Sequence, residues 1–411
     1  MVVQTKRPTN NLVIMKEGVT APKGFHAGGL HCGMRRKRKD LAWLYSEAPA
    51  NAAAMYTTNL FQAAPLQVTK ESIATEQMLQ GLIVNSAVAN ACTGEQGLHN
   101  AYQMRHWFAE TMGLKERHVA VNSTGVIGEQ LPMDKVKNGI KKITMEESSG
   151  ENFNQAILTT DTFTKSASVE LKLDDKTVTI GGSAKGSGMI NPNMATMLAF
   201  LTTDAVIEAE TLHCALQSTV NKTFNAITVD GDTSTNDTVM VMANGMADNS
   251  TITMDDEEDL QVFQQGLSLV CTELAKQIAS DGEGATKLVE VLVKGALLQE
   301  NAQAIGKSIV GSSLVKTAIF GSDVNWGRII CAAGYSGVQL DPEKVSVSIG
   351  ETQIVSNGMP LEFDESVVQY YLKTENEIQI TVDLHNGYQE AYSWGCDLSY
   401  DYVRINASYR T

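Results

Sequence analysis

The chain has 411 residues, of which 43% are hydrophobic and 19% are charged, and its formal net charge at pH 7 is −15. This composition excludes a long disordered protein, and the acidic charge excludes a general polyanion binder. The N-terminal segment lacks the apolar stretch of a signal peptide, and no apolar run reaches the ~18 residues of a membrane helix. We therefore expect a globular protein with no membrane partner.

The cysteines and histidines are scattered along the chain. Neither C-x-x-C nor H-x-x-x-H occurs, and no cysteine pair has histidines at zinc-finger spacing. This pattern indicates reduced thiols in a cytoplasmic protein rather than a disulfide framework. We expect no metal site.

Five consecutive basic residues occur at 35–39. Such a run can mark a nucleic-acid or localisation patch, but no second basic cluster and no interleaved aromatic residues accompany it. We interpret it as a solvated turn or strand edge with internal acidic partners, and we expect no nucleic-acid partner.

The periodicity of apolar residues predicts both helices and strands. Helices are expected at 99–113, 148–157, 205–219 and 256–280. Strands are expected at 81–85, 119–123, 166–173, 177–181, 197–201, 287–293 and 377–384. The strand at 197–201 does not alternate, so it should be buried on both faces. Mixed sheets covered by helices follow, which is an α/β or α+β sandwich.

Thr196 stands directly before that buried strand and after a turn-forming Asn-Pro-Asn segment. A threonine hydroxyl is a weak nucleophile without an adjacent base, and its own α-amine is the nearest one. That amine exists only if the Ala195–Thr196 bond is cut, and its pKa of about 7.7–8.0 suits proton transfer at neutral pH. Two interpretations stay open: Thr196 only starts a strand, or the loop bends the bond into reach of the hydroxyl for self-cleavage.

A second candidate lies at 121–125, where a predicted strand ends in Ser-Thr-Gly. A turn there can leave backbone N–H groups unpaired, and acyl-transfer enzymes need such donors around a developing oxyanion. Thr124 and Gly125 fit this role, although small polar turns after strands are common.

The glycine-rich segment 181–188 fails the phosphate-loop pattern, because Ser187 stands where a lysine is required. Lys185 in this segment is a candidate cation for a substrate carboxylate. The alternative is an ordinary solvent-exposed loop lysine.

Several stretches share their sequence and their order with one enzyme family. They read NSTGVIGEQLP (122–132), TTDTFTK (159–165), AKGSGMINPNMATMLAFLTTDA (184–205), FNAITVDGDTSTNDTV (224–239), DGEGATK (281–287), GSDVNWGRI (321–329) and DYVRINASYRT (401–411). Across essentially its whole length, the chain resembles the ornithine acetyltransferase (glutamate N-acetyltransferase) family. Ala87 is a departure, because the family more often has glycine after Ser86, and we expect it to touch no catalytic role.

The resemblance implies self-cleavage into an α chain, residues 1–195, and a β chain, residues 196–411, which stay together as an α2β2 heterotetramer. It also implies a layered αββα fold like that of N-terminal-nucleophile hydrolases, with its own connectivity. By position, Thr196 is the acetylated nucleophile, and Thr124 and Gly125 form the oxyanion hole. The substrate contacts that the resemblance implies are Thr159, Lys185, Thr196, Glu283, Asn406 and Thr411.

The implied reaction transfers acetyl from N²-acetyl-L-ornithine to L-glutamate in arginine biosynthesis, by a ping-pong mechanism without a cofactor. Lys185 suits the carboxylate of the donor, and Glu283 suits its cationic side chain. For these contacts the C-terminus must be docked, and residues 400–409 look like a strand that docks it.

Four alternatives remain, and one is a pseudoenzyme that cleaves itself but transfers nothing, although no expected catalytic position is lost here. Acetyl-CoA can serve as a second acetyl donor, as in some family members. In a self-processing aminopeptidase or amidase, water would replace glutamate. A binding protein that uses the basic run at 35–39 is the alternative outside enzymes, and the net charge opposes it.

Overall fold

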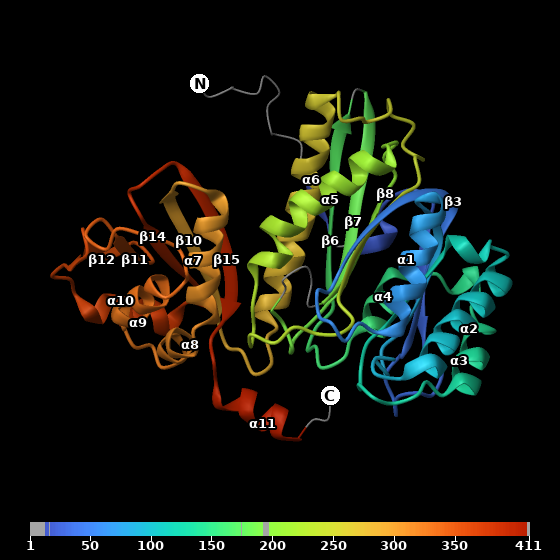
Figure 1. The fold of residues 1–411 in the computed structure, drawn as a ribbon, viewed down its shortest axis with the longest axis horizontal. Helices are drawn as coiled ribbons and strands as arrows, with labels where there is room; N and C mark the ends of the chain where they lie inside the picture. Colours follow the sequence, from blue (N-terminus) through green and yellow to red (C-terminus); the bar gives the residue numbers. More distant parts are fainter. Residues whose placement is uncertain (1–12, 16, 174, 192–196, 409–411) are drawn as a thin grey trace.

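The structure, a computed structural model, describes residues 13–15, 17–173, 175–191 and 197–408. Within these residues the strands form two sheets flanked by helices (Figure 1). No helix in this part of the chain is both long and apolar enough to cross a bilayer. The mixed α/β class predicted from the sequence is confirmed.

The larger sheet comes from residues 13–243. Its described strands are β1 (Val13–Met15), β2 (Phe25–Leu30), β3 (Leu41–Tyr56), β4 (Met78–Asn85), β5 (Val119–Ser123), β6 (Lys165–Leu173), β7 (Lys176–Lys185), β8 (Leu198–Thr203) and β9 (Thr238–Ala243). Their order is β1-β6-β7-β8-β9-β3-β4-β5, and β2 pairs with β3. The pairs β4–β5 and β8–β9 are parallel, and the other pairs are antiparallel.

This sheet folds over on itself at the long strand β3. The pairing of β3 with β4 shifts register between Tyr45 and Ala50. Asn236, just before β9, donates a side-chain hydrogen bond to the carbonyl of Ser123 at the end of β5, over 2.7 Å. In a flat sheet β9 and β5 would be three strand spacings apart, about 14 Å. The two ends of the sheet therefore face each other as two leaves.

Helices cover both sheets. They are α1 (Ala64–Glu76), α2 (Gly94–Met112), α3 (Met133–Ile140), α4 (Gly150–Ile157), α5 (Ala209–Lys222), α6 (Glu257–Ser280), α7 (Gln299–Gly311), α8 (Ser313–Phe320), α9 (Trp326–Gly334), α10 (Glu365–Thr374) and α11 (Tyr400–Ser408).

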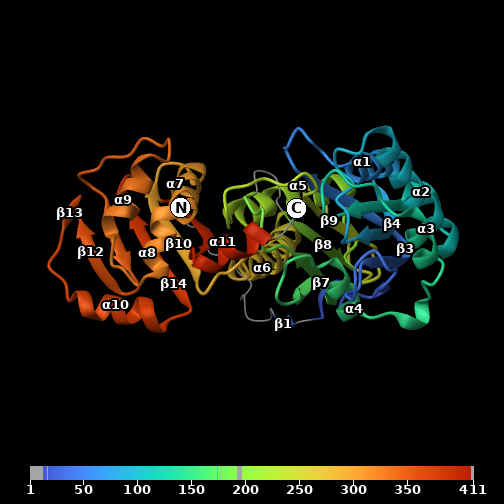
Figure 2. The same cartoon turned by 90° about the horizontal axis from the view of Figure 1, so that it is seen from below.

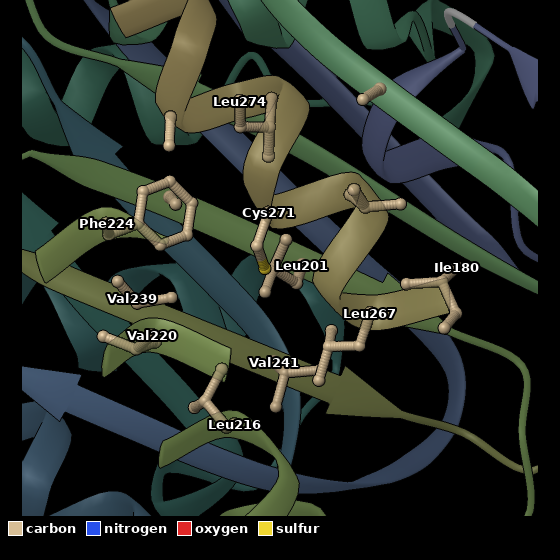
Figure 3. Close-up of a cluster of buried hydrophobic side chains, with 14 of the residues drawn as sticks. Ile180, Leu201, Leu216, Val220, Phe224, Val239, Val241, Leu267, Cys271 and Leu274 are labelled. Carbon is tan, nitrogen blue, oxygen red and sulfur yellow. The ribbon is translucent and has the colours of Figure 1, made fainter. Parts of the chain in front are cut away.

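The buried clusters follow the two leaves. Between the leaves lie alternate side chains of β4 and β8, among them Leu82, Val84 and Phe200. On the outer face of β7–β9, Leu201 packs with Phe224 and side chains of α5 and α6 (Figure 3). Helices α2 and α3 cover the outer face of β4 and β5. The expected αββα sandwich is therefore present.

The smaller sheet comes from residues 288–396. Its described strands are β10 (Leu288–Ala296), β11 (Ser346–Ile349), β12 (Thr352–Ser356), β13 (Met359–Pro360), β14 (Glu377–Asp383) and β15 (Gln389–Cys396), in the order β13-β12-β11-β14-β10-β15. Its apolar side chains gather on one face, against α7, α9 and α10. In β14 the buried side chains of this face alternate with more exposed ones.

The strand predicted at 400–409 is wrong, because the described residues of this segment, 400–408, form helix α11, which runs from the smaller sheet toward the larger one (Figure 2). Ser399 Oγ accepts the N–H of Asp401 at 3.2 Å, as an N-cap residue does. Asp401 and Arg404 form an ion pair at 3.0 Å across one turn. These local contacts favour a helix over the strand that the aromatic and branched residues suggested.

The predicted cleavage position lies outside the described residues, in the connection between β7 and β8. These two strands are antiparallel neighbours, with Ala184 opposite Ala199. A cut in this connection would leave α and β chains that share one sheet. The two sheets themselves divide elsewhere, between α6 and β10.

Candidate active site

A pocket of about 240 Å³ lies where strand ends of the two leaves meet. It is smaller than the about 300–1,000 Å³ of pockets for drug-sized ligands, so it suits a small metabolite. Six of the predicted site residues line it together, although they come from distant parts of the sequence: Thr124, Gly125, Thr159, Lys185, Glu283 and Asn406. The other predicted residues, Ala195, Thr196 and Thr411, lie outside the described residues.

Gly125 forms the turn after β5. Its φ is +132°, and a Cβ there would lie 2.2 Å from the carbonyl oxygen of Ala87, so only glycine fits. The Gly125 N–H makes no hydrogen bond within the described residues, whereas the Thr124 N–H donates to the carbonyl of Asn85 at 2.9 Å. The prediction of a free backbone N–H therefore holds for Gly125 only. Thr124 can donate a hydrogen bond to an oxyanion through its hydroxyl. Ala87, the departure from the family pattern, lies against this turn.

Lys185 is the last residue of β7 and is 8% exposed, so the alternative of a solvent-exposed loop lysine is wrong. Its Nζ donates no hydrogen bond to another residue in the described ranges. Burial lowers the pKa of Lys185, while the carboxyl groups of Asp161 and Asp237 act in the opposite direction. A buried ammonium without a direct partner favours an anionic ligand such as a carboxylate.

A buried ion cluster holds two pocket segments in place. Lys165 Nζ lies 2.8 Å from Asp161 Oδ1 and 2.5 Å from Asp281 Oδ2, and all three side chains are at most 2% exposed. Asp161 also accepts the N–H groups of Thr159 and Gly186, at 2.9 and 2.7 Å. Burial alone would raise the pKa of Asp161, but the ammonium of Lys165 holds that pKa below its usual value. The cluster thus connects the Thr159 segment with the end of β7.

Glu283 lies in the turn after α6 and is 9% exposed. Its N–H donates to the carbonyl of Ser187 at 3.0 Å, and the side-chain amide of Asn406 donates to its Oε2 at 2.8 Å. A Cβ on Gly188 would lie 2.4 Å from Glu283 Cδ, so the glycine leaves room for this carboxylate. Helix α11 thereby brings Asn406, near the C-terminus, to a buried carboxylate, and this carboxylate suits a cationic ligand group.

Two aspartates that the sequence analysis did not single out also line the pocket. Asp230 accepts the N–H groups of Met189 and Ile190, at 2.6 and 2.8 Å, and burial raises its pKa. Asp237 is 2% exposed, and burial raises its pKa well above the usual value. Its Oδ2 has no hydrogen-bond partner in the described part of the chain. The signal for both was their place in the quoted segment 224–239.

The residue bonded to the predicted nucleophile is described. Met197 lines the pocket, and its carbonyl accepts the N–H of Thr238 at 2.9 Å. Strands β8 and β9 therefore both begin at the pocket.

The basic run at 35–39 is a bend that binds the backbone of a pocket segment. Arg35 Nη1 donates to the carbonyl of Leu158 at 2.7 Å, and Arg38 Nη1 donates to that of Thr159 at 3.2 Å. The buried carboxylate of Asp40 accepts the N–H of Arg35 at 2.8 Å. The predicted turn is confirmed, and Asp40 is its internal acidic residue, although this carboxylate accepts backbone N–H groups while the cited guanidinium groups bind carbonyl oxygens. The bend supports the Thr159 segment.

The chain is similar to known proteins over nearly its full length. The model of the ArgJ family matches residues 26–411. The arginine biosynthesis bifunctional protein ArgJ of Oceanobacillus iheyensis is 54% identical over 399 residues, which cover 97% of this chain and 98% of that protein. The protein of the same name from Geobacillus kaustophilus is 54% identical over 409 residues, which cover 99% of each.

A solved structure is also similar. The crystal structure of arginine biosynthesis bifunctional protein ArgJ from Bacillus halodurans matches with a TM-score of 0.50 and 53% identity. The match covers 51% of this chain and 98% of the crystallised one, which is therefore about half as long.

Proposed function

The chain belongs to the ArgJ family and is an acyltransferase, and on that premise we propose that it transfers the acetyl group of N²-acetyl-L-ornithine to L-glutamate in arginine biosynthesis. The relatives' names place them in arginine biosynthesis. The donor and the acceptor are those that the family resemblance implies, and the charges of the pocket support the donor.

The charges in the pocket support this donor. N²-acetylornithine carries a carboxylate and a cationic side chain. The buried ammonium of Lys185 is available to the carboxylate, and the buried carboxylate of Glu283 is available to the cation. Each pair gains from partial desolvation. One observation carries the proposal: a buried cation without a direct partner in the described chain shares a small pocket with a buried carboxylate and the free N–H of Gly125.

Thr196 would act as the nucleophile after self-cleavage of the Ala195–Thr196 bond. Its new α-amine takes the hydroxyl proton while Oγ attacks the acetyl carbon. The Gly125 N–H and the Thr124 hydroxyl stabilise the resulting oxyanion. The C–N bond then breaks, the α-amine passes the proton to the leaving nitrogen, and ornithine departs. Glutamate attacks the acetyl-Thr196 ester by the same steps in reverse.

One amide is exchanged for another, so the proposed reaction needs no nucleotide, metal or redox group. Thr159, Asn406 and Thr411 would complete the substrate contacts. The two chains would assemble as an α2β2 heterotetramer.

Two observations support cleavage at 195/196. The crystallised chain from Bacillus halodurans aligns over 98% of its own length with 51% of this chain, as one of two fragments would. The antiparallel pairing of β7 with β8 would keep the fragments hydrogen-bonded across the cut.

A second acetyl donor is favoured by the word "bifunctional" in the names of the relatives. We propose acetyl-CoA, which would acetylate Thr196 directly and so allow net synthesis of acetylglutamate.

The decisive experiment is the denaturing intact mass of the wild-type protein beside Thr196→Ala. We expect two fragments that meet at 195/196 in the wild type and one inactive chain of 44.4 kDa in the variant. Thr196→Ser should still be cleaved, because the hydroxyl persists. A single 44.4 kDa species in both proteins would overturn the threonine mechanism.

The acceptor is tested with the processed wild type and N²-acetylornithine. Acetylglutamate that forms only when glutamate is present supports the transferase. Release of acetate at the same rate without glutamate would identify an amidase instead.

A further inference from the structure

Asp237 is a pocket residue to which the proposed reaction assigns no role. Its side chain is 2% exposed, and its Oδ2 has no hydrogen-bond partner in the described part of the chain. A buried carboxyl oxygen without a partner costs free energy unless a ligand supplies a hydrogen-bond donor. The position therefore points to a ligand group that carries N–H or O–H.

The chain neighbours of Asp237 contact both sides of the proposed reaction centre. The side chain of Asn236 donates to the carbonyl of Ser123, the last residue before the oxyanion turn, at 2.7 Å. The N–H of Thr238 donates to the carbonyl of Met197, the first described residue of the nucleophile segment, at 2.9 Å. Asp237 thus lies between the proposed oxyanion donor and the start of β8.

Lys185 lines the same pocket as Asp237. The charges of Lys185 and Asp237 are close enough to influence each other. In an α-amino acid the carboxylate and the nitrogen are bonded to the same carbon. A substrate whose carboxylate is bound by Lys185 therefore brings its α-nitrogen, the atom that loses or gains the acetyl group, near Asp237.

We propose that Asp237 is a further substrate-contacting residue, whose free oxygen accepts a hydrogen bond from the reacting nitrogen of both substrates. In the donor this group is the amide N–H, and in the acceptor it is the α-ammonium. The assignment rests on the proposed acetyl transfer. Burial raises the pKa of Asp237, although hydrogen bonds from Ser234 and Thr57 and the charge of Lys185 act in the opposite direction, and an ammonium bound beside the carboxyl would further favour its charged form.

The test compares two donors that differ only at the reacting atom. N²-acetylornithine has a nitrogen there, and 2-acetoxy-5-aminopentanoate has an oxygen without a hydrogen. We expect Asp237→Ala to lower kcat/KM for the amide by about tenfold more than for the ester, since the hydrogen bond from the reacting N–H to the buried carboxyl exists only with the amide. Asp237→Asn, which keeps an acceptor oxygen, should show a smaller loss. An equal loss for both donors would overturn the assignment.

Asp204→Asn is the matched control. Asp204 is a fully buried aspartate at the other end of β8, outside the pocket, and it accepts the N–H groups of Thr179 and Lys23 at 2.7 and 3.1 Å. This variant should lower stability and leave the amide-to-ester ratio unchanged. A ratio that changes equally in both variants would mean a general effect of losing a buried carboxylate.

A second measurement does not depend on turnover. Calorimetry compares the binding of ornithine with that of 5-aminopentanoate, which lacks the α-amine. The wild type should prefer ornithine, and Asp237→Ala should lose that preference; a preserved preference would contradict the assignment. A wild type that transfers no acetyl group would contradict the proposed function, and this binding comparison would still decide the role of Asp237.

Discussion

The folded-over sheet and the smaller sheet differ in their exposure to water. In the first, β8 and β9 are buried at every position, because helices cover the outer face and the other leaf covers the inner one. In the second, β14 keeps one face open, and Gln379 is exposed between the buried Ile378 and Ile380. Two strand lysines show the consequence. Lys185 on β7 is 8% exposed, whereas the side chain of Lys294 on β10 is 45% exposed.

This difference in burial explains why the candidate active site lies at the folded-over sheet. Lys185 and Asp237 lie at strand ends of the sheet that is covered on both faces and are buried, and desolvation strengthens their interaction with a substrate. The smaller sheet contributes in another way. Asp397, just after β15, accepts the N–H groups of Thr286 and Lys287 at 2.7 and 3.0 Å. This contact ties the end of the smaller sheet to the turn that carries Glu283, and it places α11 at the pocket.

Among the residues that the structure describes, the largest effect on activity is expected for Gly125→Ala. The added Cβ would lie 2.2 Å from the carbonyl oxygen of Ala87 and would move the proposed oxyanion donor, so kcat should fall about 10²- to 10³-fold. Gly337→Ala is the control, because Gly337 also has a positive φ of +83° but has open space around it. Steady-state kinetics of both variants checks the prediction. Equal activity of the two would exclude a catalytic role for the turn at Gly125.

Lys165→Met should have the next largest effect. It leaves two buried carboxylates without their shared cation, so the free energy of unfolding should fall by about 3–5 kcal/mol. The KM of N²-acetylornithine should rise as the Thr159 segment shifts. On the smaller sheet, Lys294→Met removes only a half-exposed pair with Asp383 at 3.3 Å, which is worth at most about 1 kcal/mol. Urea unfolding measures the free energy of unfolding of both variants. Similar decreases for Lys165→Met and Lys294→Met would contradict the difference in burial between the two sheets.

The pH dependence of substrate binding should report the burial of Lys185. Burial lowers its pKa below the ordinary 10.5, so its ammonium loses its proton at a lower pH than an exposed lysine does. Affinity for the substrate carboxylate is therefore present below this lowered pKa and is lost as the pH rises through it. We expect kcat/KM to decline on the alkaline side at a pH below 10.5. Lys185→Arg should keep kcat/KM high up to a higher pH. If the pH profile of this variant equals that of the wild type, Lys185 does not bind the substrate carboxylate.

The smallest effect on activity is expected for Ile380→Ala. Ile380 is fully buried in the core of the smaller sheet, so truncation should lower the free energy of unfolding by about 2–5 kcal/mol. Well below the melting temperature, kcat should stay at the wild-type value, because this core is remote from the pocket. A parallel loss of kcat would show that the smaller sheet takes part in the reaction.

Local patterns predicted many elements correctly. The apolar run at 197–201 and the alternating run at 377–384 correspond to β8 and β14. The long strand β3 was not predicted, because its segment Asn-Ala-Ala-Ala at 51–54 has little intrinsic preference for strand. It is a strand because it pairs with β9 and with β4. Such pairing joins segments distant in sequence, which local periodicity does not report.

The sequence by itself determined the family, the fold class and six residues that meet in one pocket, since the motif residues keep their identity and order whatever surrounds them. Only the tertiary structure decided that the N–H of Thr124 is already bonded to Asn85, that Lys185 is buried, and that Asp237 has an unbonded oxygen at the pocket. Hydrogen bonding and desolvation depend on which distant segments meet in space. Here they depend on the folding of one sheet over β3, which brings the end of β5 against the start of β9.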